Sequence, residues 1–439
     1  MTATKTARLH QLLGALVEIE PYEARAAGLA FLCNFVLLAC YYILRPVRDT
    51  MATVFGVDQL QHLFTLTFIA TLVCAPLFAA LASKLKLTRL LPGIFWCWLF
   101  NVLIFYFLFK HAPENRWIAG AYYVWFSVTN LFMISVFWSL MVDLFSSTQA
   151  TRLFAFIAAG GSIGAIAGPL ITRICVSVIE VSGLLLIAAA GLGLVIVLIH
   201  LLMREHQNLI NNTSPATSTK LDRHLGGNLL DGFRAVFKSS YMLNQAAFML
   251  LMTWIATIAY FLQTDWVTKS FSALTERTQA IADIDLVVNI CSALVLLLGL
   301  SRFVQRFGVT SSLILNPLLM ILAFIGVALS PSLLMIQGMQ IVRRVSQYAI
   351  ARPSREICFT VVSHENRYKA KNVIDTVVYR FGDVSAAWMQ TGLNVIGLGF
   401  TGTIALGLAA SGAWGVIAVK LGRRYEDIRA NPSTEQSVG

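Results

Sequence analysis

The stretch RYKAKNVIDTVVYRFGD, residues 367–383, runs directly into an apolar segment that is long enough to cross a membrane. Wound as a helix at about 100° per residue from Lys371 onward, the stretch gathers its charged side chains on one half of the helix and its valines, isoleucine and phenylalanine on the other. The charged residues of this face are Lys371, Asp375, Arg380 and Asp383. Such charges are costly beside lipid, so they face a polar cavity or a charged neighbour. In the alternative interpretation, Lys371 with Asp375 and Arg380 with Asp383, at i,i+4 and i,i+3 spacing, are neutralising pairs that hold two helices together. The stretch therefore indicates a membrane protein with a polar interior.

The composition of the whole chain supports this interpretation. Of the 439 residues, 57% are hydrophobic and 13% are charged, whereas soluble proteins have fewer apolar and more charged residues. Apolar runs of about 20 residues recur along the chain, and each is long enough to cross a bilayer as a helix. We therefore predict an all-α membrane protein whose partner is the lipid bilayer. Residues 1–24 contain acidic side chains and no apolar core with a cleavage site, so we expect an amphipathic lead-in there rather than a signal peptide.

The hydropathy pattern predicts twelve membrane spans, and one long polar linker divides them equally. The expected spans are residues 25–48, 60–82, 90–110, 117–143, 153–178, 182–203, 241–266, 284–302, 311–330, 332–351, 372–399 and 401–421. The linker at 204–240 separates an N-terminal six-helix half at 25–203 from a C-terminal half at 241–422, and residues 423–439 form a tail. This layout is similar to that of major facilitator transporters, whose halves rock about a site near the bilayer midplane.

Lysine and arginine are unevenly distributed between the expected loops. They concentrate in the linker, in the tail and in alternate loops, while the loops between spans nine and ten and between spans eleven and twelve have none. By the positive-inside rule, both termini and the linker are cytoplasmic. Because topology accounts for most of the net charge of +11, we expect no nucleic-acid partner.

The first span contains NFVLLACYYILRPVRDTM, residues 34–51. Arg45, Arg48 and Asp49 fall on one face at the helical period. Two guanidinium groups one turn apart suit a phosphate group, because each can bind its oxygens bidentately. In the alternative interpretation the helix ends at Leu44 and leaves both arginines among the outer lipid headgroups.

The tenth span carries a polar stripe. Its members, which share one helix face, are Gln337, Gln340, Arg344 and Gln347. Amide side chains both donate and accept hydrogen bonds, so a row of them beside an arginine suits a substrate with an anionic end and a polar ring. Hydrogen bonds between helices are the alternative explanation.

Spans four and five carry charges at their mouths and glycines inside. Asp143 and Arg152 flank the loop that joins the two spans, and both are candidates for gating salt bridges. Gly160, Gly164 and Gly168 recur every four residues in the fifth span. Glycines at this spacing let helices approach closely, so we expect tight helix packing there.

Two longer motifs resemble a known family. SREICFTVVSHENRYKAKNVIDTVVYRFGD, residues 354–383, is similar to the signature of the nucleotide-transporter (ATP/ADP antiporter) family of plastids and intracellular bacteria, a divergent branch of the major facilitator superfamily. YYILRPVRDTM, residues 41–51, resembles the first-helix motif of that family, with Arg48 where a lysine is usual. The resemblance implies twelve helices, a bacterial inner-membrane location, nucleotide exchange, and roles for basic residues in the first helix and at the start of the eleventh. The seventh span departs from it, because Gln263 and Val267 replace a glutamate and a lysine.

We therefore predict a secondary transporter that moves a phosphorylated anion by alternating access, with a nucleotide, exchanged as ATP for ADP, as the leading substrate. The expected substrate-binding residues are Arg45, Arg48, Gln340, Arg344, Lys369 and Lys371, and the expected gating residues are Asp49, Asp143, Arg152, Asp375, Arg380 and Asp383. Two alternatives stay open. One is a proton-coupled transporter of another small organic molecule, with proton entry at Asp143 or Asp375, and the other is a membrane scaffold that transports nothing.

The sequence holds few signs of other chemistry. The seven cysteines are scattered and form no cluster with histidine. A Gly-rich phosphate loop before a Lys-Ser/Thr pair is missing from the sequence. We expect a monomer that needs no metal and no cofactor and is not an enzyme.

Overall fold

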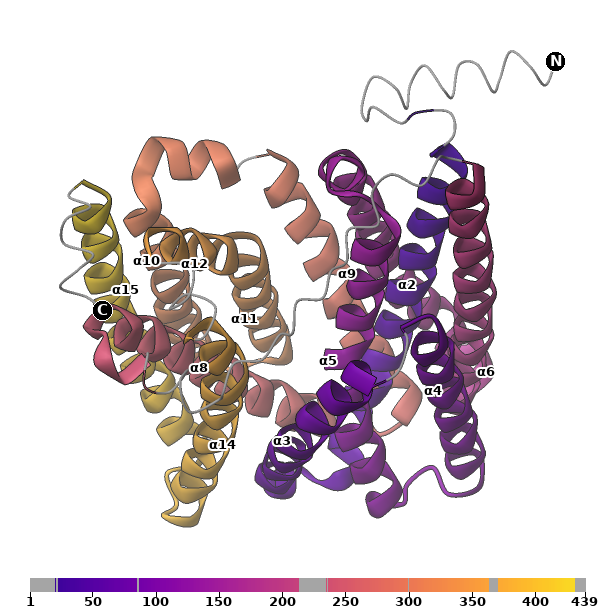
Figure 1. The fold of residues 1–439 in the computed structure, drawn as a ribbon. Helices are drawn as coiled ribbons and strands as arrows, with labels where there is room; N and C mark the ends of the chain where they lie inside the picture. Colours follow the sequence, from indigo (N-terminus) through magenta and orange to yellow (C-terminus); the bar gives the residue numbers. More distant parts are fainter. Residues whose placement is uncertain are drawn as a thin grey trace. The chain divides into compact units, whose positions relative to one another are not determined.

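A computed structural model describes residues 20, 23–84, 87–212, 234, 236–298, 300–362 and 370–430. Within these residues the regular structure is helical, without strands (Figure 1). The longer helices are α2 (Ala24–Phe55), α3 (Leu60–Lys84), α4 (Leu87–His111), α5 (Arg116–Leu144), α6 (Ser147–Asn212), α8 (Ser240–Ser270), α9 (Leu274–Leu298), α10 (Leu300–Leu329), α11 (Leu333–Ser346), α12 (Arg352–Cys358), α14 (Tyr379–Val395) and α15 (Gly399–Ala430). Short 3-10 turns lie at η1 (Val57–Gln59) and η3 (Phe359–Val361), and π-helical turns at η2 (Gln347–Ala351) and η4 (Ile374–Val378).

Nine helices in the described part of the chain are long and apolar enough to cross a membrane. The apolar part of α6, Thr148–Glu205, has 58 residues, whereas about 20 suffice for one crossing. Its backbone leaves the helical region at Glu180, where φ is 60° and ψ is 177°, so α6 consists of two helices that meet there. The helices α11 and α14 carry polar faces and coincide with two further expected spans. The all-α membrane fold is confirmed, while the count of twelve spans stays a prediction.

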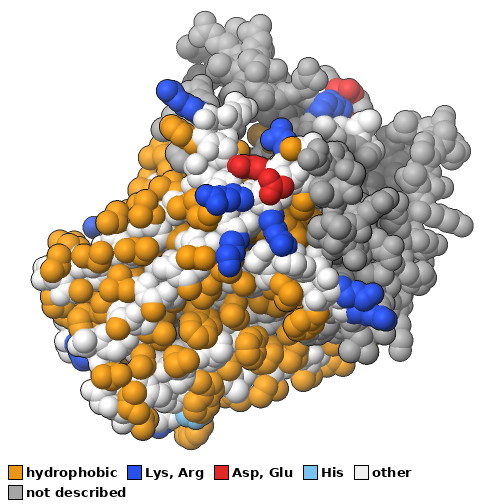
Figure 2. Space-filling view, turned by 90° about the vertical axis from the view of Figure 1, so that its left-hand side faces the viewer, with side chains coloured by type: hydrophobic (Ala, Val, Ile, Leu, Met, Phe, Trp, Pro, Cys, Tyr) orange, Lys and Arg blue, Asp and Glu red, His pale blue; other side chains and the backbone are white. Residues whose placement is uncertain are grey.

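Large apolar side chains cover much of the exterior. Leu297, Leu329 and Val395 are among the most exposed of them. On the face shown in Figure 2, hydrophobic side chains cover most of the described surface, and the charged side chains gather mainly toward one end. An apolar surface of this extent is costly in water and matches the hydrocarbon of a bilayer.

The chain forms two compact units, and each contains a short segment from the other half of the sequence. The first unit comprises Met1–Phe55, Ile69–Leu221 and Ala273–Leu286, and the second comprises Gly56–Phe68, Asp222–Ser272 and Val287–Gly439. The N-terminal part of α9 therefore belongs to the first unit. The lead-in at 1–24 and the linker at 204–240 fall largely outside the described residues, and the predicted domain boundaries stay predictions.

The first unit is built around α2, which packs closely against α6. A Cβ atom added to Gly164 would lie 2.1 Å from the carbonyl oxygen of Phe35, and one added to Gly160 would lie 2.5 Å from that of Phe31. Gly168 repeats the contact one turn further along. No side chain fits at such distances, so the expected packing role of these glycines is confirmed.

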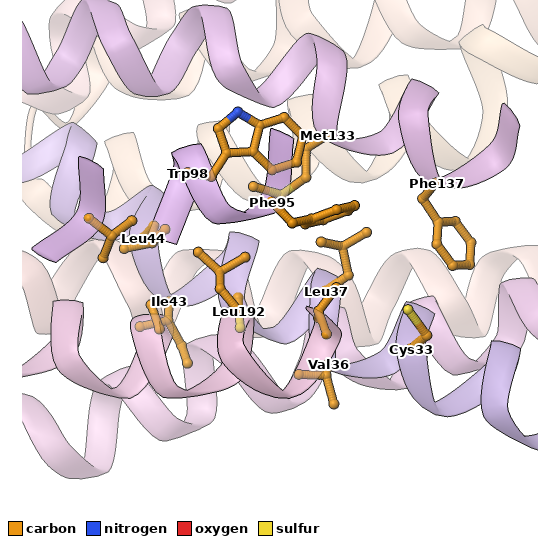
Figure 3. Packing of buried hydrophobic residues seen from close by; sticks show 14 of the residues in the cluster. Cys33, Val36, Leu37, Ile43, Leu44, Phe95, Trp98, Met133, Phe137 and Leu192 are labelled. Atoms are coloured by element: carbon orange, nitrogen blue, oxygen red, sulfur yellow. The ribbon is translucent and has the colours of Figure 1, made fainter. Parts of the chain in front are cut away.

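An apolar core surrounds α2 on its other sides. Figure 3 shows Leu37 and Leu44 of α2 in one cluster with Phe95 and Trp98 of α4 and Leu192 of α6. All five side chains are buried. The polar end of α2 is therefore held by a rigid apolar scaffold.

The second unit repeats this arrangement around α8. A Cβ atom added to Gly382 of α14 would lie 2.0 Å from the hydroxyl oxygen of Thr253 in α8. On another side of α8, the rings of Phe248 and Trp414 have their centroids 5.3 Å apart. The contact of α14 with α8 thus corresponds to that of α6 with α2, as expected for two related halves.

Candidate functional site

The arginines of the first span lie inside a continuous helix. α2 runs through Pro46 to Phe55, so the alternative in which the helix ends at Leu44 is wrong. Arg45 lies ten residues before the end of the helix, which is about 15 Å at 1.5 Å per residue and close to half of a bilayer core. The side chains of Arg45 and Arg48 are 12% and 17% exposed. Both cations are therefore placed at membrane depth and largely shielded from solvent.

Arg48 is held by a carboxylate and by two aromatic rings. Its Nε donates to Oδ1 of the neighbouring Asp49 over 2.8 Å. Its guanidinium carbon lies 5.3 Å from the ring centroid of Tyr123 and 5.9 Å from that of Phe126, both on α5. Because the rings cover the guanidinium while leaving its edge polar, the site has both a cation and aromatic faces to offer a ligand.

Arg45 forms an ion pair that the sequence analysis missed. Its Nη1 lies 3.8 Å from Oδ1 of Asp285, in the part of α9 that belongs to the first unit, and the Asp285 side chain is 0% exposed. The expected eighth span began at residue 284, which put Asp285 at its very start, whereas α9 begins at Leu274 and places Asp285 in its middle. The available signal was a polar stripe at helical spacing, formed by Thr278, Asp285, Asn289 and Ser292.

Hydroxyl groups extend the contact between α2 and α9. The hydroxyls of Thr50 and Thr278 share a hydrogen bond of 2.7 Å, and Nη1 of Arg277 donates to the Thr53 hydroxyl over 3.1 Å. As the residue number rises on α2 it falls on α9, so the two helices run antiparallel here. We call this row of contacts, from Arg277–Thr53 through Thr50–Thr278 to Arg45–Asp285, the α2–α9 seam.

The charged face of residues 371–383, which we call the charged ladder, lies in the second unit. Its first ion pairs differ from those that the helical spacing suggested. Nη1 of Arg355 lies 2.7 Å from Oδ1 of Asp375, while Lys371 forms an ion pair with Glu356. The suggested pair of Lys371 with Asp375 is therefore wrong: Arg355 reaches Asp375 from α12, and Asp375 sits in the π-helical turn η4, which changes the register of the ladder. Lys369, another expected binding residue, lies outside the described residues.

Arg380 and Asp383, further along the charged ladder, form the ion pair that their i,i+3 spacing suggested. Nη1 of Arg380 lies 3.4 Å from Oδ2 of Asp383, and the hydroxyl of Thr257 in α8 donates to Oδ1 of Asp383 over 3.2 Å. This places the ladder against the central helix of the second unit.

The polar stripe of α11 is buried and includes an arginine that sequence reasoning overlooked. Gln340, Arg344 and Gln347 are each almost completely buried. Arg343 donates from Nε to Oε1 of Gln340 over 2.9 Å and from Nη1 to Oε1 of Gln347 over 2.8 Å. The guanidinium of Arg344 lies 6.0 Å from the ring centroid of Tyr348. Two of the expected substrate amides thus already bind a cation of their own helix.

At the mouth of span five, Arg152 forms ion pairs with two glutamates near the start of α2. Arg152 forms ion pairs with Glu23 at 3.1 Å and with Glu20 at 3.6 Å, and Glu23 is buried. Asp143 lies exposed near the end of α5. Among the described residues, no group of three or more His, Cys, Asp and Glu side chains could hold a metal ion.

Comparison with known protein families identifies the superfamily of this chain. The model of the Major Facilitator Superfamily matches residues 30–344. The chain belongs to this superfamily. As a facilitator it is a multi-pass membrane transporter and not an enzyme, which confirms both predictions. The match also argues against the scaffold alternative, because the superfamily consists of transporters.

Individual relatives and solved structures match most of the chain. This facilitator is 21% identical to "ADP,ATP carrier protein 1" of Chlamydia pneumoniae over 466 aligned positions, which cover 90% of each chain. Its fold resembles the crystal structure of the nucleoside transporter NupG with a TM-score of 0.64 at 16% identity, covering 93% of this chain and all of that one. It also resembles a bacterial homologue of the iron transporter ferroportin with a TM-score of 0.66 at 12% identity, covering 91% and 99% of the two chains. At these identities the structural matches show the fold alone.

Proposed function

We propose that this facilitator carries a phosphorylated anion, with a nucleotide as the leading candidate, and that it works by alternating access. The observation that carries the proposal is the pair of arginines on α2 at membrane depth, both largely shielded and one turn apart. Guanidinium groups grip phosphate oxygens bidentately, and the interaction is strong where water is scarce.

The aromatic side chains around these arginines suit the other end of a nucleotide. Tyr41 stacks on Phe126 with centroids 5.6 Å apart, and Tyr123 covers Arg48. Flat rings beside phosphate-binding cations are the combination that nucleotide binding uses, because a base can stack while its phosphates are gripped. The relationship to an ADP,ATP carrier supports the same substrate class.

The remaining predicted residues keep proposed roles. Gln340, Arg344, Lys369 and Lys371 keep a proposed role in substrate binding. The ion pairs of Asp49, Asp143, Arg152, Asp375, Arg380 and Asp383 would break and form as the carrier changes state. Exchange of ATP for ADP is the proposed mode, in a bacterial inner membrane with both termini cytoplasmic. The departures at Gln263 and Val267 make a different partner nucleotide the first variation to test.

The proton-coupled alternative used Asp143 or Asp375 as the entry point. Asp375 already forms an ion pair with Arg355 at 2.7 Å, so a cation of its own unit occupies it. The excess of guanidinium groups on α2 also favours an anionic cargo over a neutral one.

A thermal-shift screen in detergent tests the proposal. ATP, ADP, GTP, AMP, inorganic phosphate and the free nucleosides are compared on the parent chain and on Arg48→Gln, with Arg25→Gln as the matched control. Arg25 is an arginine of the same helix with a side chain that is 74% exposed. We expect nucleotides to raise the melting temperature of the parent and of Arg25→Gln but not of Arg48→Gln, because only ligands that bind the folded state stabilise it. Stabilisation by nucleosides alone would contradict the proposal.

A further inference from the structure

We infer that a basic patch at the start of α8 and the end of α15 binds the phosphate headgroup of an anionic phospholipid, whose acyl chains lie along the apolar face of α15. The patch belongs to the second unit, and its side chains are all exposed. The basic patch consists of Arg234 and Lys238, which precede α8, and of Lys420, Arg423 and Arg424 near the end of α15. This lipid site does not depend on the identity of the cargo.

One face of α15 changes from apolar to cationic within one helical turn. Ala409 and Val416 lie on this face at the helical period, and Lys420, Arg423 and Arg424 continue it. All five side chains are exposed, that of Val416 to 55%. At about 1.5 Å per residue, Lys420 follows Val416 after about 6 Å and Arg424 after about 12 Å. A phospholipid has the same order of parts, because its charged headgroup lies within about that distance of the hydrocarbon.

The start of α8 adds a cation and an aromatic ring to this surface. Nη1 of Arg424 donates to the hydroxyl of Ser240, the first residue of α8, over 2.7 Å. In the helical turn before α8, Val236 is buried in the apolar core, whereas Phe237 is 69% exposed and Lys238 is also exposed. An exposed phenylalanine beside cations is typical of surfaces that lie at the boundary between headgroups and acyl chains. The patch therefore offers a lipid both charge and apolar surface.

The described part of the chain does not balance the charge of the basic patch. Within that part, none of the five cations lies at ion-pair distance from a carboxylate. Asp427 shares their face of α15, and Glu426 accepts a hydrogen bond from the hydroxyl of Thr310 in α10. Five cations near one carboxylate repel one another, so an anion that binds among them is stabilised.

The related helix ends of the first unit are neutralised within the chain. There Nη1 of Arg25, at the start of α2, lies 3.4 Å from Oε2 of Glu205, near the end of α6. In the second unit, Arg424 contacts the hydroxyl of Ser240 instead. A cytoplasmic excess of Lys and Arg explains the cations of both units but not this difference. The second unit is therefore the one suited to a counter-ion from outside the chain.

An anionic phospholipid matches both parts of this surface. Guanidinium groups bind phosphate oxygens bidentately, and each Lys or Arg near a membrane surface strengthens the attraction to anionic lipid. The acyl chains would contact Val416 and Phe237, which a free phosphate ion would leave exposed. On the face shown in Figure 2, Lys and Arg side chains likewise gather beside a largely apolar surface.

The test measures lipid binding to the purified full chain by native mass spectrometry in detergent. The probes are phosphatidylglycerol, phosphatidylcholine with the same acyl chains, and soluble glycerol 3-phosphate. We expect the parent to bind phosphatidylglycerol at least about 10-fold more tightly than phosphatidylcholine, and glycerol 3-phosphate far more weakly than either lipid. The triple variant Lys420→Gln, Arg423→Gln and Arg424→Gln should lose about 10- to 100-fold in affinity for phosphatidylglycerol, since each cation contributes roughly 5-fold.

A second triple variant controls for the change in net charge. Arg25→Gln, Lys110→Gln and Arg116→Gln remove three exposed cations from the first unit, and this variant should bind phosphatidylglycerol like the parent. Arg423→Lys with Arg424→Lys keeps the charge of the patch and should retain most of the binding. Thermal unfolding in phosphatidylcholine checks that all variants are folded, which we expect because the substituted side chains are exposed.

Three results would overturn the lipid site. Equal binding of the two lipids by the parent would show that the patch does not select an anionic headgroup. Equal losses in the two triple variants would mean that the net charge of the chain, and not the patch, attracts the lipid. Binding of glycerol 3-phosphate as tight as that of phosphatidylglycerol would assign the cations to a free phosphate compound. None of these results bears on the nucleotide proposal, which rests on the first unit.

Discussion

The central ion pairs of the two units differ in how far their acidic partners are exposed to solvent. In the first unit, one pair joins Arg45 to Asp285, whose side chain is 0% exposed. In the second unit, Arg355 binds Asp375, which is 31% exposed, and Glu356 stands between Arg355 and Lys371. Breaking the Arg45–Asp285 pair is costly because both charges are shielded from water, while Asp375, Glu356 and Lys371 are 31%, 44% and 38% exposed and can exchange partners at a lower cost. The first arrangement suits a site that holds one charge, and the second suits a gate.

The largest expected effect comes from removing the buried partner. Asp285→Ala leaves the Arg45 guanidinium without its carboxylate and should destabilise the chain by about 3–5 kcal/mol. Asp283→Ala, on the exposed side of the same helix, should cost at most about 1 kcal/mol. Thermal unfolding in detergent measures both. The double change Arg45→Met with Asp285→Leu should recover most of the loss, because apolar side chains of similar size replace buried ion pairs well. If Asp285→Ala and Asp283→Ala lower the stability equally, burial does not make the Arg45–Asp285 pair special, and the comparison with the second unit fails.

The two units can also be compared by the close helix contacts at their glycines. In the first unit, the atom that a new Cβ at Gly164 would meet is the backbone carbonyl of Phe35, and in the second unit the atom at Gly382 is the hydroxyl of Thr253. A hydroxyl can rotate away, whereas a helix carbonyl cannot. Gly164→Ala should therefore cost about 1–3 kcal/mol, and Gly382→Ala should cost less. Gly412→Ala, which meets nothing within 4 Å, is the control. The reverse order in thermal unfolding would show that the α14–α8 contact is the more rigid one.

The smallest effect on stability is expected in the half-exposed network. Lys371 is 38% exposed, so Lys371→Gln should change the unfolding free energy by less than about 1 kcal/mol. Transport in liposomes should nevertheless fall, since Lys371 is proposed to contact the substrate. A variant with unchanged stability and unchanged transport would show that Lys371 only neutralises Glu356, as the structure pairs them.

The fold could be predicted from the sequence because it depends on strong, local signals. Runs of apolar residues marked the spans, and the spacing of Gly160, Gly164 and Gly168 predicted their packing against another helix. The positions of Arg45 and Arg48 on one helix face also followed from the helical period alone. These features need no knowledge of which helices are neighbours.

The pairing of the charges could not be predicted in the same way. Asp285 was overlooked because it stood at the very start of the expected span 284–302, whereas α9 begins at Leu274 and places it in the middle of the helix. The helical spacing offered Asp375 as the alternative partner of Lys371, although Arg355 on α12 pairs with that carboxylate and Glu356 binds Lys371. Ion pairs between helices depend on which helices meet, and that information lies outside any one helix.

The central claim is that Arg48 grips a phosphate group of the cargo, and exchange in liposomes tests it most directly. Liposomes loaded with ADP and containing the parent chain, Arg48→Gln or Arg25→Gln receive labelled ATP or labelled adenosine. We expect ATP to enter through the parent and through Arg25→Gln, and adenosine to stay outside. Arg48→Gln should reduce ATP entry by about 10- to 100-fold, as a lost charged hydrogen bond of about 1.5–3 kcal/mol implies. Entry of adenosine without ATP, or equal ATP entry through Arg48→Gln and the parent, would contradict the account.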